Sequence, residues 1–72
     1  MEPMTIPRRI HEAALFLEAD YWSQKRAIKE AGRRSLKAKS LNLLDEWNYW
    51  GHVAAYLSIK DGGIPIEIID AD

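Results

Sequence analysis

The sequence Gly32-Arg33-Arg34-Ser35 (GRRS) lies between two long stretches of helix-forming residues, and it decides the predicted fold. Glycine just past the end of a helix adopts the left-handed conformation that caps the last carbonyls. A serine hydroxyl can cap the start of the next helix. Because a link this short makes two helices antiparallel neighbours, the sequence predicts an all-α fold, an antiparallel hairpin of two long helices joined at residues 32–35.

The first helix is expected over residues 7–31, because apolar residues recur there at spacings of three and four. Pro7 suits the first turn, where the missing N–H costs nothing. The stripe consists of Ile10, Ala14, Leu17, Tyr21, Ile28 and Ala31, with Gln24 as its single polar interruption. An alternative interpretation places a break at residues 20–23, where Ser23 would start a fresh helix.

The second helix is expected over residues 36–60, and its apolar arc is wider than one neighbouring helix can cover. We therefore expect a second copy of the chain to pack against it, which gives a homodimer with a four-helix arrangement. The expected core and dimer contacts are Leu43, Leu44, Trp47, Trp50, Ala54 and Leu57.

The length of 72 residues and the absence of cysteine support this homodimer. Small domains usually need disulfides, a metal or a partner subunit to be stable, and disulfides are excluded here. The small size also argues against an enzyme, which needs a pocket with several converging polar groups. The sequence predicts a single domain that is not an enzyme.

The last segment, residues 63–72, is rich in β-branched residues and is expected to be extended. Pro65 confines such a strand to an edge or to its first residue. A lone strand cannot complete its own hydrogen bonds. Three arrangements therefore stay open: pairing with the same strand of a second copy, docking on the helices as an arm, or a mobile tail.

The net charge of −1 hides a strongly basic segment at residues 25–39, which holds seven Lys and Arg residues against one acid, Glu30. A concentrated charge of this kind steers association with charged partners. We expect the segment to contact an acidic protein surface or nucleic-acid phosphates. The alternative is a solvated helix face that keeps the protein in solution.

No motif for catalysis, metal binding or a cofactor is found. His11-Glu12 begins like the zinc motif H-E-x-x-H, but Leu15 occupies the place of the second histidine. No cofactor is therefore predicted. The longest apolar run, residues 13–17, is far shorter than the ~20 residues that span a membrane. We expect no membrane partner and a cytoplasmic location.

Three aromatic residues, Trp22, Tyr49 and Tyr56, fall away from the apolar stripes. Exposed tryptophan and tyrosine often dominate the binding energy of interfaces, so these residues are predicted to contact a partner. The bases Arg33, Arg34 and Lys37 are predicted to steer it. A DNA-binding helix-turn-helix fits less well, because its expected second helix continues without a break into the tryptophans.

The two stripes, Ile10 to Ala31 and Leu36 to Leu57, together with the size and aromatic content, resemble small accessory proteins of bacteriophages and plasmids. One such group is the plasmid RNA-binding hairpins that dimerise into four-helix bundles. The other is phage host-takeover proteins, including anti-activators that bind a transcription factor. The resemblance implies a homodimer, a host protein as partner and a location in the host cytoplasm. No functional residue can be carried over from either group.

These observations lead to one predicted function and one alternative. The predicted function is that of a protein-interaction module that binds a host regulatory protein, for example a transcriptional activator, and inhibits it by covering its working surface. The alternative is a nucleic-acid-binding regulator that uses the basic segment 25–39, whose affinity would fall steeply with salt.

Overall fold

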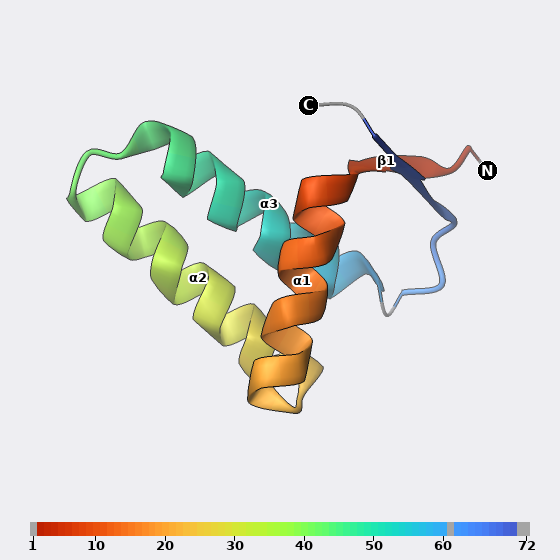
Figure 1. Ribbon diagram of the computed structural model, residues 1–72, viewed down its shortest axis with the longest axis horizontal. Coiled ribbons are helices and arrows are strands. Elements are labelled where there is room, and N and C mark those ends of the chain that lie inside the picture. The colour runs from red at the N-terminus through yellow and green to blue at the C-terminus, as the bar shows by residue number, and fades with distance from the viewer. Residues whose placement is uncertain (1, 61, 71–72) are drawn as a thin grey trace.

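The computed structural model describes residues 2–60 and 62–70, and most of these are helical, as the sequence predicts. Two helices lie side by side as an antiparallel hairpin, and a third crosses the end of the hairpin that is nearer the strands (Figure 1). The elements in chain order are β1 (Met4–Pro7), α1 (Arg8–Tyr21), α2 (Gln24–Ser40), α3 (Leu44–Lys60) and β2 (Ile66–Ile69).

The single first helix predicted over residues 7–31 is wrong, and the alternative with a break near Ser23 is right. Trp22 adopts a left-handed conformation with φ of 56°, and its N–H donates to the carbonyl of Glu18 at 2.9 Å, which ends α1. The Ser23 hydroxyl then accepts a hydrogen bond from the Arg26 N–H at 3.4 Å and caps α2. A single serine cap thus divides one apolar stripe into two helices.

The turn predicted at residues 32–35 is also wrong, because the hairpin turns ten residues later. Asn42 has a φ of 61°, and its N–H donates to the carbonyl of Lys39 at 3.0 Å. The Leu43 N–H donates to the carbonyl of Ala38 at 2.8 Å. These two bonds form a Schellman motif, in which asparagine takes the left-handed position that glycine usually occupies.

The residues of the predicted turn lie inside α2 instead. Gly32 is in the middle of the helix, and residues 36–40, predicted to open the second helix, form the last turn of α2. The Ser35 hydroxyl, predicted to cap that second helix, is buried in the hairpin and donates to the carbonyl of Trp47 at 3.0 Å. The second helix therefore begins only at Leu44.

The core lies where α1 crosses the hairpin. Alanines of α1 and α2 are fully buried at this crossing, and their small side chains let the helices approach closely. The buried cluster consists of Ile6, Ile10, Ala14, Leu17, Ala27, Ala31, Val53, Tyr56 and Leu57. Helix α3 packs against α2 on one side and α1 on the other. The wide apolar arc that led us to expect a dimer is therefore partly covered within one chain.

Polar contacts join the end of α3 to both α2 and the crossing helix α1. The Gln24 amide, the one polar group in the first apolar stripe, donates to the carbonyl of Leu57. That carbonyl belongs to the last turn of α3. Lys60 forms an ion pair with Glu18 of α1. Each contact gives a polar side chain a partner at the edge of the core.

The extended C-terminal segment forms β2, and its partner is a strand that the sequence did not predict. Strands β1 and β2 run parallel, with Met4 opposite Ile66, and the Met4 N–H donates to the carbonyl of Pro65 at 2.9 Å. An ion pair between Arg8 and Asp70 joins the same two ends of the chain. Residues 71–72 of the predicted tail lie outside the described residues.

Candidate interaction surface at the hairpin tip

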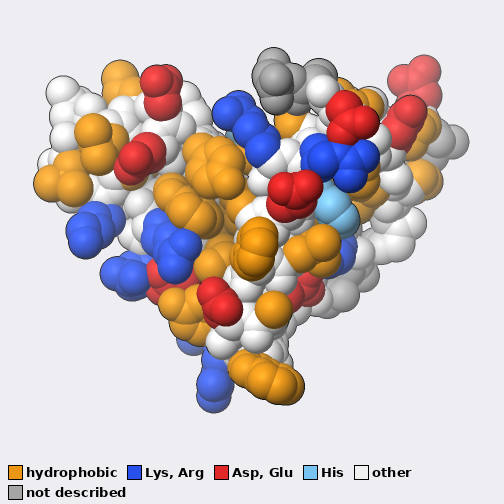
Figure 2. Space-filling model, in the orientation of Figure 1, with side chains coloured by type: hydrophobic (Ala, Val, Ile, Leu, Met, Phe, Trp, Pro, Cys, Tyr) orange, Lys and Arg blue, Asp and Glu red, His pale blue; other side chains and the backbone are white. Residues whose placement is uncertain are grey.

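Apolar side chains remain exposed at the tip of the hairpin, the end that α1 does not reach. Four leucines, which we call the tip leucines, share this property: Leu36, Leu41, Leu43 and Leu44. Figure 2 shows hydrophobic side chains at this end, between basic side chains along α2 and acidic ones near the start of α3. An exposed apolar cluster with a polar rim is typical of an interaction site.

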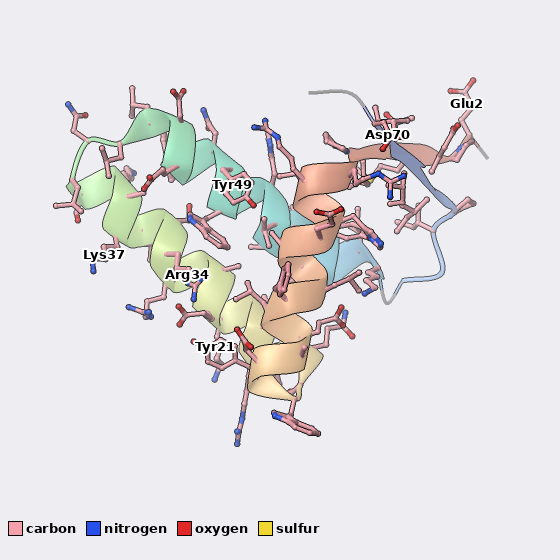
Figure 3. The ribbon with its side chains drawn as sticks, viewed as in Figure 1. Glu2, Tyr21, Arg34, Lys37, Tyr49 and Asp70 are labelled. Carbon is pink, nitrogen blue, oxygen red and sulfur yellow. The ribbon has the colours of Figure 1, made fainter. Side chains whose placement is uncertain are left out.

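Two of the tip leucines line a groove between α2 and α3. We call this the tip groove, and its lining residues are Arg34, Lys37, Ala38, Leu41, Leu43, Glu46 and Trp50. Arg34 and Lys37 project from the same side of α2, as expected for residues three apart on a helix (Figure 3). The Arg34 guanidinium lies 4.7 Å from the centre of the Trp50 ring, a cation–π contact.

The charges beside the groove are only partly neutralised. Glu30 is buried and accepts hydrogen bonds from Arg33 at 2.9 and 2.7 Å and from Arg34 at 2.6 Å. The two guanidinium groups lower the pKa of Glu30 to about 2, so this carboxylate stays ionised. Lys37 is exposed and forms no ion pair with a described residue. The groove therefore keeps a positive side that is open to a ligand.

The predicted partner-binding residues lie at different places. Arg34 and Lys37 line the tip groove, and Arg33 lies just outside it, bound to Glu30. Tyr49 is half-buried, and its ring meets the edge of Trp50 at a centroid distance of 5.0 Å. Trp22 is 91% exposed but sits at the corner between α1 and α2.

Tyr56 is not the exposed anchor that the sequence led us to expect. It is only 3% exposed and belongs to the core. Its hydroxyl lies 2.7 Å from Nδ1 of His11, so it links α3 to α1. The error arises because Tyr56 lies off the apolar stripe of the second helix, and the sequence alone did not place α1 against it.

The predicted core and dimer residues of α3 divide along the helix. Leu57 is fully buried, and Trp50 and Ala54 are half-buried against the core. Trp47 is half-buried nearer the tip, with the Lys39 ammonium 5.2 Å from the centre of its ring. Leu43 and Leu44 are exposed, which corrects their assignment to the core of the chain.

The sequence reasoning missed two features of the surface. It did not assign Leu41 to the interaction site, because the turn was placed before rather than after this residue. It also did not assign Leu15 and Phe16, which are exposed on the outer face of α1. The signal for the second feature was available, since an unbroken apolar run at residues 13–17 puts apolar side chains on both faces of a helix.

Within residues 2–60 and 62–70, no group of three His, Asp or Glu side chains lies close enough to hold a metal ion. None of the described helices is long and apolar enough to cross a membrane. What the described surface offers is apolar contact area, cations and aromatic faces, all of which act in non-covalent recognition.

Comparison with known proteins gives no match, whether to a family model, to a curated protein or to a solved structure.

Proposed function

We propose that this chain is a non-enzymatic protein-interaction module that binds a partner protein through the tip groove. The observation that supports this most directly is the combination of exposed tip leucines with Arg34 and Lys37 around the half-buried Trp50. Arginine and tryptophan are enriched among the residues that dominate interface energies. An apolar patch of this kind, bordered by charge, is suited to a protein ligand.

The partner segment is expected to carry aliphatic or aromatic side chains next to Asp or Glu. The apolar side chains would cover Leu41 and Leu43, which are exposed in the free chain. The carboxylates would meet Lys37, whose ammonium has no ion pair with a described residue. Opposite charges across an interface mainly raise the association rate and the specificity.

The mode of action that we propose is occlusion, in which this small chain covers a working surface of its partner. The identity of that partner as a host transcriptional activator, a phage or plasmid origin and a cytoplasmic location stay predictions from the sequence. The homodimer expected through the apolar face of the second helix also stays a prediction, and a different self-contact, on α1, is argued separately below.

Peptide selection on the full chain tests the proposal. A random peptide display library is selected on the wild-type protein, and the recovered peptides are measured against two matched leucine variants, Leu41→Gln and Leu15→Gln. We expect peptides that combine apolar and acidic residues, with affinity at least about tenfold weaker for Leu41→Gln. The Leu15→Gln variant, changed on α1, should bind them as the wild type does.

A charge variant completes this test. Lys37→Glu should weaken the same peptides and should make the remaining binding less sensitive to salt. Circular dichroism melting of each variant checks that it is folded. Failure to recover any peptide, or peptides that bind Leu41→Gln and wild type equally, would refute the tip groove as the binding site.

The second candidate function is nucleic-acid binding through residues 25–39, where seven bases lie on one helix. Two observations weigh against it: Arg33 and Arg34 are held by Glu30, and the carboxylate of Glu46 borders the groove. A mobility-shift titration with a DNA duplex and an RNA hairpin at two salt concentrations separates the functions. Binding whose affinity falls steeply with salt would favour the nucleic-acid alternative.

A further inference from the structure

The outer face of α1 carries a second exposed apolar surface, separate from the tip. Leu15 and Phe16 lie on the side of α1 opposite the buried Ile10, Ala14 and Leu17, and Phe16 is 70% exposed. These two residues line a shallow depression together with Glu12 and Ala19. We call the surface formed by Glu12, Leu15, Phe16 and Ala19 the α1 outer face. In Figure 1 this helix crosses in front of the hairpin, and Figure 2 shows hydrophobic side chains along it.

A base and an acid border this face on the same flank. Arg9 and Asp20 are eleven residues apart, which is close to three turns of helix, so they lie along one line beside the apolar stripe. Both are exposed, and neither forms an ion pair with a described residue. The Arg9 guanidinium lies 5.8 Å from the centre of the Tyr49 ring and stays available to a carboxylate.

The charges of α1 also run against its own dipole. Its first turn holds Arg8 and Arg9 and no acid, and its last turn holds Glu18 and Asp20 and no base. Helices favour the reverse order, with acids first and bases last. Asp70 compensates Arg8 and Lys60 compensates Glu18. Arg9 and Asp20 remain without such compensation among the described residues.

We propose that the α1 outer face is the contact between two copies of this chain, with the two α1 helices antiparallel across a two-fold axis near Leu15. In a contact with two-fold symmetry, every pair of residues occurs twice. If Arg9 of one copy meets Asp20 of the other, then Asp20 of the first copy also meets Arg9 of the second. Reversing one helix brings Arg9 of each copy beside Asp20 of the other, on the same flank. Phe16 and Leu15 of both copies cover each other in the middle.

A second copy fits this face better than an unrelated ligand, because the face is complementary to itself. Its base lies six residues before Leu15 and its acid lies five residues after Leu15, so the two nearly exchange places when one helix is reversed. Antiparallel pairing also places the two helix dipoles in opposite directions, which is favourable. The contact spans only about three turns of helix, which is at the low end of specific interface sizes. The dimer is therefore expected to be weak, with a dissociation constant in the micromolar range or above.

Sedimentation of the full chain tests the dimer and its surface. Wild-type protein should shift from monomer to dimer as its concentration rises from roughly ten to several hundred micromolar, a range chosen for a small interface. Phe16→Glu should remain monomeric throughout. Leu36→Glu changes one of the tip leucines, which is 68% exposed and lies away from the α1 outer face. This variant should dimerise like wild type. Circular dichroism confirms that both variants are folded.

Charge exchange tests the antiparallel arrangement. Arg9→Asp and Asp20→Arg should each raise the dissociation constant of the dimer by about five- to tenfold. Each substitution puts two like charges opposite each other, and the two-fold symmetry repeats that repulsive pair. The double variant with both substitutions should recover the wild-type dissociation constant. A dimer that the single variants leave unchanged, or a double variant weaker than either single one, would refute this arrangement.

Cross-linking gives a geometric test, because the chain has no cysteine of its own. Leu15→Cys lies near the proposed axis and should form a disulfide-linked dimer under mild oxidation. Leu36→Cys should form much less of it at the same protein concentration. Equal cross-linking by the two variants, a wild type that is monomeric at every concentration, or dimerisation of Phe16→Glu would each overturn the proposal.

Discussion

The two ends of the α2–α3 hairpin carry similar apolar side chains, yet one end forms the core and the other stays exposed. At the base, α1 covers Ala31, Val53 and Leu57, and all three are fully buried. At the tip, nothing within the described chain covers Leu41 or Leu43. The difference depends on the placement of α1 and not on the composition of the hairpin. It suggests that the base stabilises the fold and that the tip is available for binding.

The comparison can be tested most strongly with leucine truncation at each end. Leu57→Ala should lower the free energy of unfolding by about 2–5 kcal/mol, because it removes a fully buried side chain and leaves a cavity. Leu41→Ala, at the exposed tip, should change it by no more than about 0.5 kcal/mol. Urea unfolding of both variants measures the difference. Equal losses would mean that the tip is packed as tightly as the base.

A smaller effect is expected from the hydrogen bond that joins α1 to the base. Tyr56→Phe removes the hydroxyl that lies 2.7 Å from Nδ1 of His11 and should cost about 0.5–1.5 kcal/mol. Tyr49→Phe is the matched control, since the Tyr49 hydroxyl has no hydrogen bond to a described side chain or backbone group. Thermal melting should show a larger loss of stability for Tyr56→Phe than for Tyr49→Phe. A larger loss for Tyr49→Phe would contradict a stabilising hydrogen bond between Tyr56 and His11 at the base of the hairpin.

The middle of α2 is tested by replacing its glycine. A Cβ at Gly32 would meet no atom within 4 Å, so Gly32→Ala should stabilise the protein by about 0.5–1 kcal/mol through better helix propensity. If the hairpin instead turned at residues 32–35 with a left-handed glycine, alanine would destabilise it. The sign of the change in melting temperature therefore shows whether Gly32 lies inside α2 or in the turn of the hairpin.

A pH dependence is expected from Glu30, which lies between base and tip. Its pKa of about 2 is below the ordinary 4.5, so its contribution to stability is fully present above about pH 4.5 and is lost as the pH falls through 2. Wild type should therefore lose stability more steeply than Glu30→Gln over this interval. Urea unfolding at several pH values gives the comparison, and parallel curves for the two proteins would contradict the paired carboxylate.

The errors in the predicted fold have local physical causes. The apolar stripe of residues 10–31 does continue at helical spacing, but the cap at Ser23 ends one helix and starts another within it. Gly32 suggested a helix end because glycine favours the left-handed conformation, whereas Asn42 took that position in the real turn. Periodicity reports which residues face a core, and it does not report where a helix bends.

The candidate sites were predictable to different degrees. The basic character around Arg34 and Lys37 could be read from the charge pattern, because seven bases fall within fifteen residues. The exposure of Leu41 could not, because the turn was placed before this residue, and the burial of Tyr56 could not, because it depends on where a sequence-distant helix, α1, lies. The same limit applies to β1, whose four residues become a strand only by pairing with β2.

The sequence by itself determined a mainly helical chain with two apolar stripes, no disulfide and a concentrated basic segment, because these properties follow from composition and short-range spacing. The tertiary structure decided that the stripes form three helices, that the two chain ends pair as strands, and that the crossing of α1 buries one end of the hairpin. The physical reason is that burial depends on contacts between residues far apart in the sequence, here α1 against Val53 and Leu57. Those contacts leave the tip groove and the α1 outer face as the surfaces on which function can be tested.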